Sequence, residues 1–264
     1  MGSLQRGVEG SNNNATAIAL LVDYCQRRIR ESLEGGFEYH HMAISRSNAF
    51  LRKHDSQQLP LYVMFVDIVG STKLSSELSP DLLSKLVTIY LQEVAYVIEH
   101  YGGYVLKYVG DAVLGYFPPE EKKNREEEED GIDGNAASAN NIVNCARSVV
   151  QVVKDGMNPV LEQESLPRIS VKATADYGNN TIVRYGSDRR RSHIDIISLT
   201  MNLTAKMQNL TRPNHITIGN EFHSRLGPEM QANFSEVSIG RTKWKYHSLG
   251  ASRPYKIFED KYRS

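Results

Sequence analysis

The sequence predicts an α+β fold with a βαββαβ core, in which helices pack against a mostly antiparallel sheet. Three observations support this prediction. An apolar run at 61–66 is typical of a strand that is buried on both faces. A long amphipathic pattern that starts at Pro80 predicts a helix. Two strand-like segments around Gly110-Asp111 predict a hairpin directly after that helix.

The first core helix has clear start and end signals. Ser79 is placed to cap its N-terminus, Pro80 suits its first turn, and Gly102 suits its exit. Between these signals, apolar residues recur at helical spacing and form one broad face. They are Leu82, Leu83, Leu86, Tyr90, Val94, Val97, Ile98 and Tyr101. The helix returns the chain to the hairpin.

The hairpin carries chemical groups as well as structure. Its strands, 104–109 and 112–117, are rich in β-branched and aromatic residues, and Gly110 tolerates the positive φ of a tight turn. The turn therefore presents the carboxylate of Asp111 at an exposed tip. Lys107 lies on the arm that leads to this tip, although a purely structural hairpin does not need a lysine within a strand.

The rest of the chain is expected to add helices and strands to this unit. A second helix runs from Ile142 to Val153 and closes before Pro159. Strands are expected at 168–175 and 180–185, around the turn-like 176–179. The remaining expected elements are a strand at 193–197, a helix around 199–210, a strand at 216–218, a short helix at 221–226 and strands at 236–247 and 253–258. This order gives a ferredoxin-like core with appended elements.

The N-terminal region is expected to be less regular. Residues 1–14 are polar and rich in Gly, Ser and Asn, which predicts disorder. Apolar residues from Ile18 to Leu33 then recur at helical spacing until Gly35-Gly36. This amphipathic helix either packs on its own domain or makes a dimer-forming or signal-coupling contact.

The sequence divides into two parts at residue 57. The region 1–57 contains the polar tail, the amphipathic helix and a connector at 37–57 without a clear period. The region 58–264 is the main domain, and its acidic and Gly-rich segment 118–140 predicts an inserted surface loop.

Composition excludes several classes of protein. The 264 residues contain 31 Lys and Arg against 31 Asp and Glu, so the formal net charge is zero. A nucleic-acid or anionic-membrane surface needs a basic excess, which argues against both partners. No apolar run is long enough to span a bilayer, and Cys25 and Cys145 form no CxxC pair. We expect a cytoplasmic protein without a disulfide scaffold or a zinc site.

A second carboxylate ends the first strand. Asp67 is followed by the run 68–72, whose Gly-Ser-Thr opens a helical segment, and backbone N–H groups at a helix start attract phosphate. In a βαββ unit the first strand and the hairpin share a sheet, so Asp67 and Asp111 can converge at one edge. Two converging carboxylates suit cations of the magnesium type, which bridge to phosphates. The alternative is two unrelated turn aspartates.

Three motifs together resemble the class III nucleotidyl cyclase domain. They are Phe65-Val-Asp67-Ile-Val-Gly-Ser-Thr72, Gly102-Gly-x-x-x-Lys107-x-x-Gly-Asp111-Ala, and Asp195 followed seven residues later by Asn202 in Met201-Asn-Leu-Thr-Ala-Lys206. The resemblance covers roughly residues 58–260. It implies the class III cyclase fold and a nucleotidyl cyclase activity.

The resemblance implies roles for the matching residues. Asp67 and Asp111 match the family's two metal-binding aspartates, with the Ile68 carbonyl also near a metal. Lys107 and Asp195 match the pair that reads the adenine base. The other implied contacts are Gly70, Ser71 and Thr72 with substrate phosphate, Asn202 with the ribose, and Lys206 at the position of a transition-state arginine.

The implied reaction converts ATP to 3′,5′-cyclic AMP and pyrophosphate with two Mg²⁺ or Mn²⁺ ions. The 3′-hydroxyl must line up with the α-phosphorus, and the metals lower the pKa of that hydroxyl and neutralise the leaving phosphates. Asp195 can accept a hydrogen bond from the adenine amino group, and Lys107 can donate one to a ring nitrogen. Guanine presents a carbonyl where adenine has an amine, so this pair indicates ATP.

The resemblance also implies a partner. In the family, the metal and base groups of one site come from different subunits, which implies a head-to-tail homodimer with two shared sites.

Several residues depart from the family pattern. Lys206 replaces an arginine and loses the planar fork that grips two phosphate oxygens. Ser198 stands where the family often has glycine, and Asp176-Tyr177 replaces the usual His-Thr. Arg190, or a neighbour in its basic cluster, either supplies positive charge to the phosphates or belongs to a solvated turn. Lys243 and Lys245 are both candidates for a C-terminal phosphate lysine.

These departures leave alternatives to an adenylate cyclase. One is a degenerate cyclase-like module that binds nucleotide or dimerises with little turnover. Another is a cyclase that uses a different nucleoside triphosphate.

Overall fold

The computed structural model describes residues 2–35, 42–119, 134–186, 188, 192–238, 244–247 and 254–262. The helices are α1 (Gly2–Gly35), α2 (Met42–Lys53), α3 (Ser71–Glu77), α4 (Pro80–His100), α5 (Gly134–Gln151), the π-helix η1 (Val152–Met157), α6 (Asn158–Gln163), α7 (Leu199–Met207), α8 (Asn220–His223) and α9 (Pro228–Gln231). The strands are β1 (Gln58–Ile68), β2 (Tyr104–Val109), β3 (Ala112–Phe117), β4 (Val171–Tyr185), β5 (His193–Ile197), β6 (His215–Gly219), β7 (Phe234–Glu236) and β8 (Ile257–Asp260).

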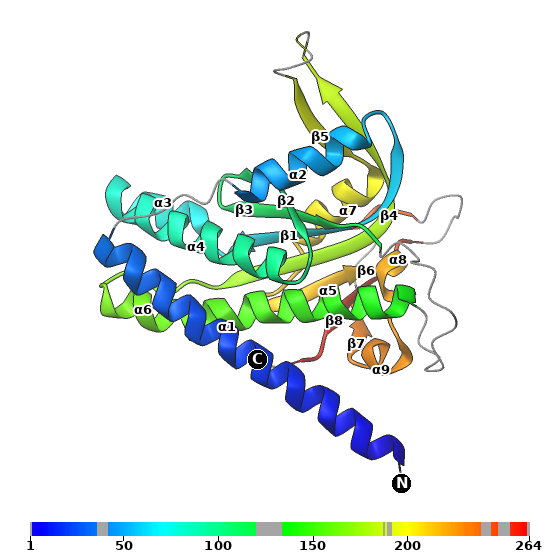
Figure 1. Ribbon diagram of the computed structural model, residues 1–264, viewed down its shortest axis with the longest axis horizontal. Helices are drawn as coiled ribbons and strands as arrows, with labels where there is room; N and C mark the ends of the chain where they lie inside the picture. The colour runs from blue at the N-terminus through cyan, green and yellow to red at the C-terminus, as the bar shows by residue number, and fades with distance from the viewer. Residues whose placement is uncertain are drawn as a thin grey trace.

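A single sheet of these strands lies at the centre of the fold (Figure 1). Its order is β2-β3-β1-β4-β6-β8-β7, and β5 pairs with β4 off this path. The pair β4–β6 is parallel, and the other pairs between the described strands are antiparallel. The predicted α+β architecture with a mostly antiparallel sheet is therefore confirmed.

The two faces of the sheet carry different hydrophobic clusters. Along β1, side chains alternate between the faces. Tyr62 and Met64 join a large cluster with α1, α4, α5 and η1, and this side is called the α4 face. Leu61 and Val63 join a smaller cluster with α2 and α7, and this side is called the α7 face. Asp67 shares the parity of Leu61 and Val63, so its side chain lies on the α7 face.

The hairpin and the first core helix agree with their predictions. Strands β2 and β3 have the expected bounds, and Gly110 adopts a φ of 61° in the turn between them. Helix α4 begins at Pro80, and the Ser79 side chain accepts a hydrogen bond from the Leu82 N–H at 3.4 Å. The cap, the proline and the turn glycine therefore define these elements as local chemistry predicts.

The N-terminal helix packs on the domain. Ile18, Leu21, Cys25 and Ile29 are buried, and α1 crosses α5 and η1 (Figure 1). Arg28 pairs with Glu93 of α4, where its Nε lies 3.1 Å from Oε1. Of the two uses expected for this amphipathic helix, contact with its own domain is present in the structure.

Four expectations near the helices are wrong. Helix α1 begins at Gly2, because residues 1–14 contain no proline and extend a helix that is already packed further along. The connector contains α2, which buries Leu51 through a short apolar stripe. The helical run does not close before Pro159, because proline needs no N–H partner in the first turn of α6. Residues 134–140 belong to α5 rather than to a loop, and 120–133 lie outside the described residues.

Two expectations about strands are also wrong. The turn-like segment 176–179 is part of one continuous strand, β4. A Cβ at Gly178 would lie 2.2 Å from the Thr200 Oγ1, so this glycine serves the close approach of α7 rather than a turn. The C-terminal strands are shorter than expected, and residues 239–243 and 248–253 lie outside the described residues.

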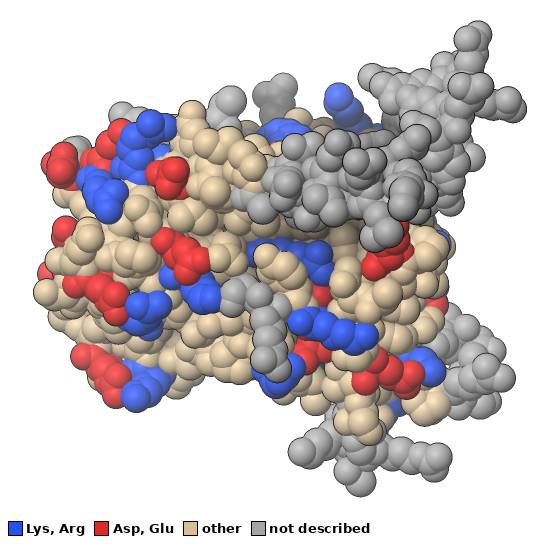
Figure 2. All heavy atoms as spheres, turned by 90° about the horizontal axis from the view of Figure 1, so that it is seen from below, with Lys and Arg blue, Asp and Glu red and all other residues tan. Residues whose placement is uncertain are grey.

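Three features of the described residues concern charge, cysteines and membrane-spanning helices. On the face shown in Figure 2, acidic and basic side chains are interspersed. Cys25 and Cys145 are free and buried. Within the described residues, no helix combines the length and apolar character needed to cross a membrane.

Candidate active site

The two candidate metal-binding carboxylates lie together at one end of the sheet. Antiparallel pairing of β1 with β3, with Val66 opposite Val113, brings the hairpin turn beside the end of β1. The Ile68 N–H donates a hydrogen bond to the Asp111 Oδ2 at 3.2 Å. Burial and the neighbouring Asp111 carboxyl raise the pKa of Asp67 to about 6. The structure therefore brings Asp67, Ile68 and Asp111 together.

These groups fit a divalent cation of the magnesium type. Mutual repulsion of two partly buried carboxylates favours a cation between them, and hard carboxylate and carbonyl oxygens are the ligands that such cations prefer. Among the described residues, no cluster of three or more His, Cys, Asp or Glu side chains forms a complete metal cage. The set of Asp67, Asp111 and the Ile68 carbonyl thus leaves coordination positions for phosphate oxygens and water.

Tyr90 is a further polar group close to the carboxylates. Its side chain on α4 is fully buried, and its hydroxyl has no hydrogen-bond partner in the structure. Burial, together with the charges of Asp67 and Asp111, raises the pKa of Tyr90. A buried hydroxyl without a partner costs about 1–3 kcal/mol, so a reoriented carboxylate would gain a donor here.

A pocket of about 170 Å³ adjoins the Asp111 carboxylate. It lies between α3, α4 and the hairpin turn. Its lining residues are Ile68, Ser71, Leu74, Ser75, Leu83, Val87, Gly110 and Asp111. Gly70 starts α3 with a φ of 73°, and no side chain caps the helix there. The structure places Ser71 in this pocket, whereas Thr72 is exposed and does not line it.

The two candidate base-reading residues are in direct contact. The Lys107 Nζ forms an ion pair with the Asp195 Oδ2, and the second oxygen of Asp195 accepts a hydrogen bond from the Ile196 N–H at 2.9 Å. The Asp195 side chain is 13% exposed and that of Lys107 is 33% exposed. The pair therefore presents one donor and one acceptor in a partly desolvated place.

A β-bulge gives Lys107 its direction. Val105 pairs with Gly115, but Lys107 rather than Leu106 pairs with Leu114, so β2 contains one extra residue. A one-residue shift moves every following side chain to the opposite face. Without the bulge, Lys107 would point to the α4 face. With it, Lys107 shares the α7 face with Leu114 and reaches Asp195.

The candidate catalytic residues of α7 are accessible. Asn202 and Lys206 are both exposed and stand four residues apart, so they lie on one side of the helix. Ser198 caps this helix, because its Oγ accepts a hydrogen bond from the Met201 N–H at 2.8 Å. Lys245 is exposed, whereas Arg190 and Lys243 lie outside the described residues.

The site residues form two groups within one chain. The first contains Asp67, Ile68 and Asp111, and the second contains Lys107 and Asp195. No hydrogen bond or ion pair joins the two groups in the described part of the chain. Lys107 lies on β2, whereas Asp111 lies in the turn between β2 and β3.

Sequence reasoning missed Lys172. This residue pairs with Asp67 across β1 and β4, so both side chains lie on the same face. Its charge lowers the pKa of Asp67, against the larger effect of burial, and its Nζ donates to the Gln208 carbonyl at 3.2 Å. The sequence signal that could have identified Lys172 is its place as the single lysine within the mostly apolar run 169–175.

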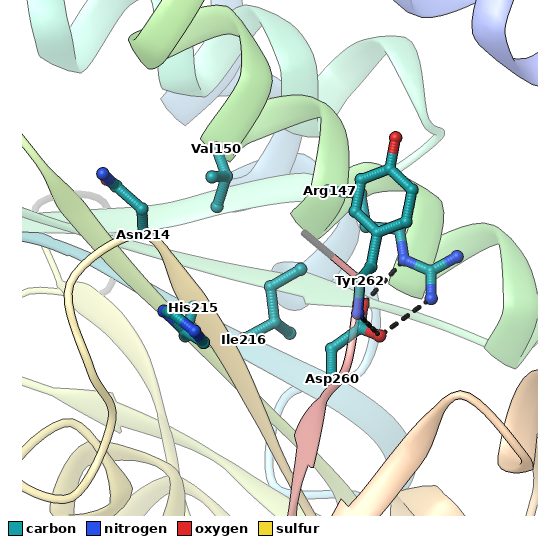
Figure 3. Close-up of a pocket in the computed structure, with 7 residues that line it drawn as sticks. All are labelled: Arg147, Val150, Asn214, His215, Ile216, Asp260 and Tyr262. Carbon is teal, nitrogen blue, oxygen red and sulfur yellow. Dashed lines mark hydrogen bonds and ion pairs between the residues drawn. The ribbon is translucent and has the colours of Figure 1, made fainter. Parts of the chain in front are cut away.

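A second pocket is not a candidate site. It measures about 10 Å³, which is room for no more than one water molecule. Figure 3 shows Arg147 and Asp260 facing each other at its edge, with Nε–Oδ2 at 2.7 Å and Nη2–Oδ1 at 2.9 Å. These charges satisfy one another and attach β8 to α5.

Paired carboxylates at the end of a sheet, with a pocket beside one of them, are an arrangement with which phosphoryl-transfer enzymes position a phosphate chain through cations. The family model of the adenylate and guanylate cyclase catalytic domain matches residues 55–251. The chain therefore belongs to this family. Class III cyclases bind nucleoside triphosphates, generally depend on divalent metals and usually act as dimers.

Curated relatives differ in the nucleotide that their names give. A cytidylate cyclase of Escherichia coli is 24% identical over 212 residues, which cover 74% of this chain and 44% of the relative. A cytidylate cyclase of Staphylococcus aureus is 28% identical over 179 residues, which cover 67% of this chain and 39% of the relative. An adenylate cyclase of Anabaena cylindrica is 26% identical over 152 residues, which cover 57% of this chain and 27% of the relative. The chain thus spans less than half the length of these relatives.

Solved structures agree on the fold. The guanylyl cyclase Cya2 matches with a TM-score of 0.60 and 20% identity, over 78% of this chain and 93% of that one. The adenylyl cyclase CyaB from P. aeruginosa matches with a TM-score of 0.55 and 24% identity, over 77% of this chain and 94% of that one. The predicted class III cyclase fold is therefore confirmed.

Proposed function

We propose that this chain cyclises a nucleoside triphosphate whose base carries an exocyclic amine, with ATP as the first candidate substrate. The convergence of Asp67 and Asp111 at the end of β1 is the observation that supports this activity. The products are the 3′,5′-cyclic nucleotide and pyrophosphate, and a cytoplasmic location is part of the same proposal.

The first group of residues acts on the phosphates. Asp67, Asp111 and the Ile68 carbonyl would hold two Mg²⁺ or Mn²⁺ ions, which lower the pKa of the 3′-hydroxyl and neutralise the leaving pyrophosphate. Ser71 and the backbone after Gly70 face the phosphate chain from the pocket. The 3′-hydroxyl gives up its proton to solvent, its oxygen bonds to the α-phosphorus, and the bond from that phosphorus to the pyrophosphate oxygen breaks.

The second group reads the base. Asp195 accepts a hydrogen bond from an exocyclic amine, and Lys107 donates one to the adjacent ring nitrogen. Adenine has this amine-and-acceptor edge, whereas guanine and uracil present a carbonyl instead of the amine. The ion pair leaves both groups able to bind a base, because the Lys107 ammonium has further N–H donors and the Asp195 carboxylate has further lone pairs.

CTP is a second candidate substrate. Cytosine has an exocyclic amine beside a ring-nitrogen acceptor, so its edge offers Lys107 and Asp195 the same pattern as adenine. Two curated relatives are named cytidylate cyclases, which supports this candidate. Because a pyrimidine is smaller than a purine, Lys107 and Asp195 must reach closer to the ribose to bind cytosine than to bind adenine.

The proposed active form is a head-to-tail homodimer in which each site combines groups from two subunits. Exposed apolar side chains beside both groups support such a contact. They are Tyr108 and Val109 at the hairpin tip, and Ile197 and Leu199 at the junction of β5 and α7. Asn202 and Lys206 of one subunit would then act on the ribose and the phosphates held by the other.

Mixing two inactive variants tests the shared site. Asp67→Asn removes a metal ligand, and Asn202→Ala removes the ribose contact. If sites are shared, a mixed dimer contains one site free of both substitutions and recovers up to about a quarter of the wild-type activity after random exchange. Mixtures that stay as inactive as each variant alone exclude composition across subunits.

The nucleotide panel tests the activity itself. Purified chain is incubated with Mn²⁺ and, separately, with ATP, CTP, GTP and UTP, and cyclic products are identified by mass spectrometry. Cyclic AMP or cyclic CMP is expected as the main product. A main product from GTP or UTP contradicts the base-reading rule, and no cyclic product from any of the four contradicts the enzymatic function.

A further inference from the structure

Helix α2 lies against both strands that carry the base-reading pair. Lys107 is on β2 and Asp195 is on β5, and α2 contacts each of these strands. Figure 1 shows α2 beside β5 and close to β2. The contacts of α2 therefore bear on how far apart Lys107 and Asp195 can move.

On the β2 side, α2 makes an aromatic and polar contact. The Phe50 ring lies 5.1 Å from the Tyr104 ring and 5.8 Å from the Tyr116 ring. The Arg46 guanidinium lies 4.2 Å above the Tyr104 ring and donates to the Gly103 carbonyl at 3.3 Å. These contacts fix α2 to the start of the strand that carries Lys107.

On the β5 side, Arg52 holds the backbone directly. Its Nη2 donates to the Ser192 carbonyl at 2.6 Å, and its Nη1 lies 3.4 Å from the Ser192 Oγ. Ser192 is 4% exposed and immediately precedes β5. A planar guanidinium can make both contacts at once, which the single ammonium of lysine cannot reproduce.

Strand β5 needs such a restraint. It pairs with β4 and lies off the main order of the sheet, so no described strand holds its second edge. Asp55, just after α2, adds an ion pair to Arg184 of β4, with Oδ2 and Nε 2.7 Å apart. Asp195 is three residues beyond the carbonyl that Arg52 holds, so movement of β5 there moves Asp195 relative to Lys107.

We propose that Arg52 is a positioning residue for base recognition, because its grip on Ser192 fixes β5 and thereby Asp195 at the distance from Lys107 that an amine-bearing base requires. This inference rests on the proposed function, since it assumes that Lys107 and Asp195 read the base. Arg52 itself touches neither the base nor the phosphates in this role. It determines specificity through the position of Asp195.

Three variants test the inference in the full chain. Arg52→Ala removes both contacts with Ser192, and Arg52→Lys keeps the charge but has a single donor nitrogen in place of two. Lys53→Ala is the matched control, because Lys53 is the exposed next residue of the same helix. KM, kcat and the ratio of kcat/KM for ATP and CTP over GTP and UTP are measured for each, together with hydrogen exchange of the β5 amides.

The expected result separates positioning from general stability. Arg52→Ala raises KM for the preferred nucleotide about tenfold, changes kcat by less than about twofold and lowers the base preference, because an unfixed Asp195 still leaves the metal groups intact. Faster exchange at 193–197 accompanies these changes. Arg52→Lys restores part of the preference, and Lys53→Ala behaves as the wild type.

Each contrary result has a distinct meaning. An active wild type whose KM and base preference are unchanged by Arg52→Ala overturns the inference and leaves the proposed function intact. Equal losses of kcat for every nucleotide also overturn it, because they indicate general damage. A wild type that neither turns over nor binds ATP or CTP by calorimetry refutes the proposed function, and the inference falls with it.

Discussion

The buried carboxyl of Asp176 gives a stability prediction with a definite sign. Its side chain on β4 is 1% exposed. It accepts hydrogen bonds from the Tyr255 hydroxyl at 2.7 Å and from the Tyr177 N–H at 2.9 Å. Burial is the largest effect and raises the pKa of Asp176 to about 7, against the lowering effect of these donors. The carboxyl is thus held where its charged form is costly.

The magnitude follows from linkage. In the unfolded chain an aspartate has a pKa of about 3.9, so the folded state binds more protons between about pH 4 and pH 7. The stability due to neutral Asp176 is complete below about pH 4 and is lost as the pH rises through about 7. A shift of about three pKa units corresponds to roughly 4 kcal/mol across this window, as an upper limit.

Substitution of Asp176 by Asn tests this reasoning. An amide resembles the neutral carboxylic acid in size and can still accept the backbone hydrogen bonds. Urea unfolding of wild type and Asp176→Asn is measured at several values between pH 4.5 and pH 8. The variant is expected to lose stability less steeply with rising pH, so that the difference between the two proteins grows toward pH 8 by roughly 2–4 kcal/mol.

The comparison needs a control for charge in general. Asp81→Asn changes an exposed aspartate in the first turn of α4 and is expected to leave the slope of wild type over this range nearly unchanged. Parallel curves for wild type and Asp176→Asn would refute the assignment of a raised pKa to this carboxyl.

Two further predictions concern the active site, and a third concerns the packing of α7 on β4. Tyr90→Phe removes only the hydroxyl, which has no partner in the structure. If a carboxylate ligand turns to accept this hydroxyl when the cation binds, the Mn²⁺ concentration that half-saturates the rise in melting temperature increases about tenfold in the variant. An unchanged titration shows that no carboxylate ligand does so. Lys206→Arg restores a planar fork and is expected to raise kcat about tenfold if Lys206 limits the reaction, whereas continued inactivity of both proteins favours a binding module without turnover. Gly178→Ala places a Cβ 2.2 Å from the Thr200 Oγ1, and we expect the free energy of unfolding in urea to fall by about 1–3 kcal/mol. A second substitution, Thr200→Ala, is expected to restore part of this loss. No recovery in the double variant means that the two residues do not clash.

Local chemistry predicted much of the fold. Helix α4 and the hairpin carry their own start, stop and turn residues, so their bounds could be read from Ser79, Pro80 and Gly110. The segment 176–179 has the composition of a turn, yet it is strand because Gly178 makes room for Thr200. Asp176 likewise has a buried structural partner in Tyr255, which lies 79 residues away in the sequence. Such contacts depend on tertiary packing and cannot be deduced from neighbouring residues.

The candidate site shows the same limit. The expectation that Asp67 and Asp111 converge needed only the order of strands, and the hydrogen bond between Ile68 and Asp111 agrees with it. Lys172 enters this place through the β1–β4 register, which no local pattern specifies. The roles of these residues stay predictions, as does the division of the chain at residue 57.

The bulge in β2 connects these observations to specificity. Side chains alternate along a strand, so a regular β2 with Leu106 opposite Leu114 would turn Lys107 toward the α4 face. The extra residue places Lys107 opposite Leu114, where it forms the ion pair with Asp195 of β5. A single inserted residue thus determines whether the donor of the base-reading pair reaches its acceptor. Base recognition in this chain therefore depends on strand register as much as on the identity of the two charged residues.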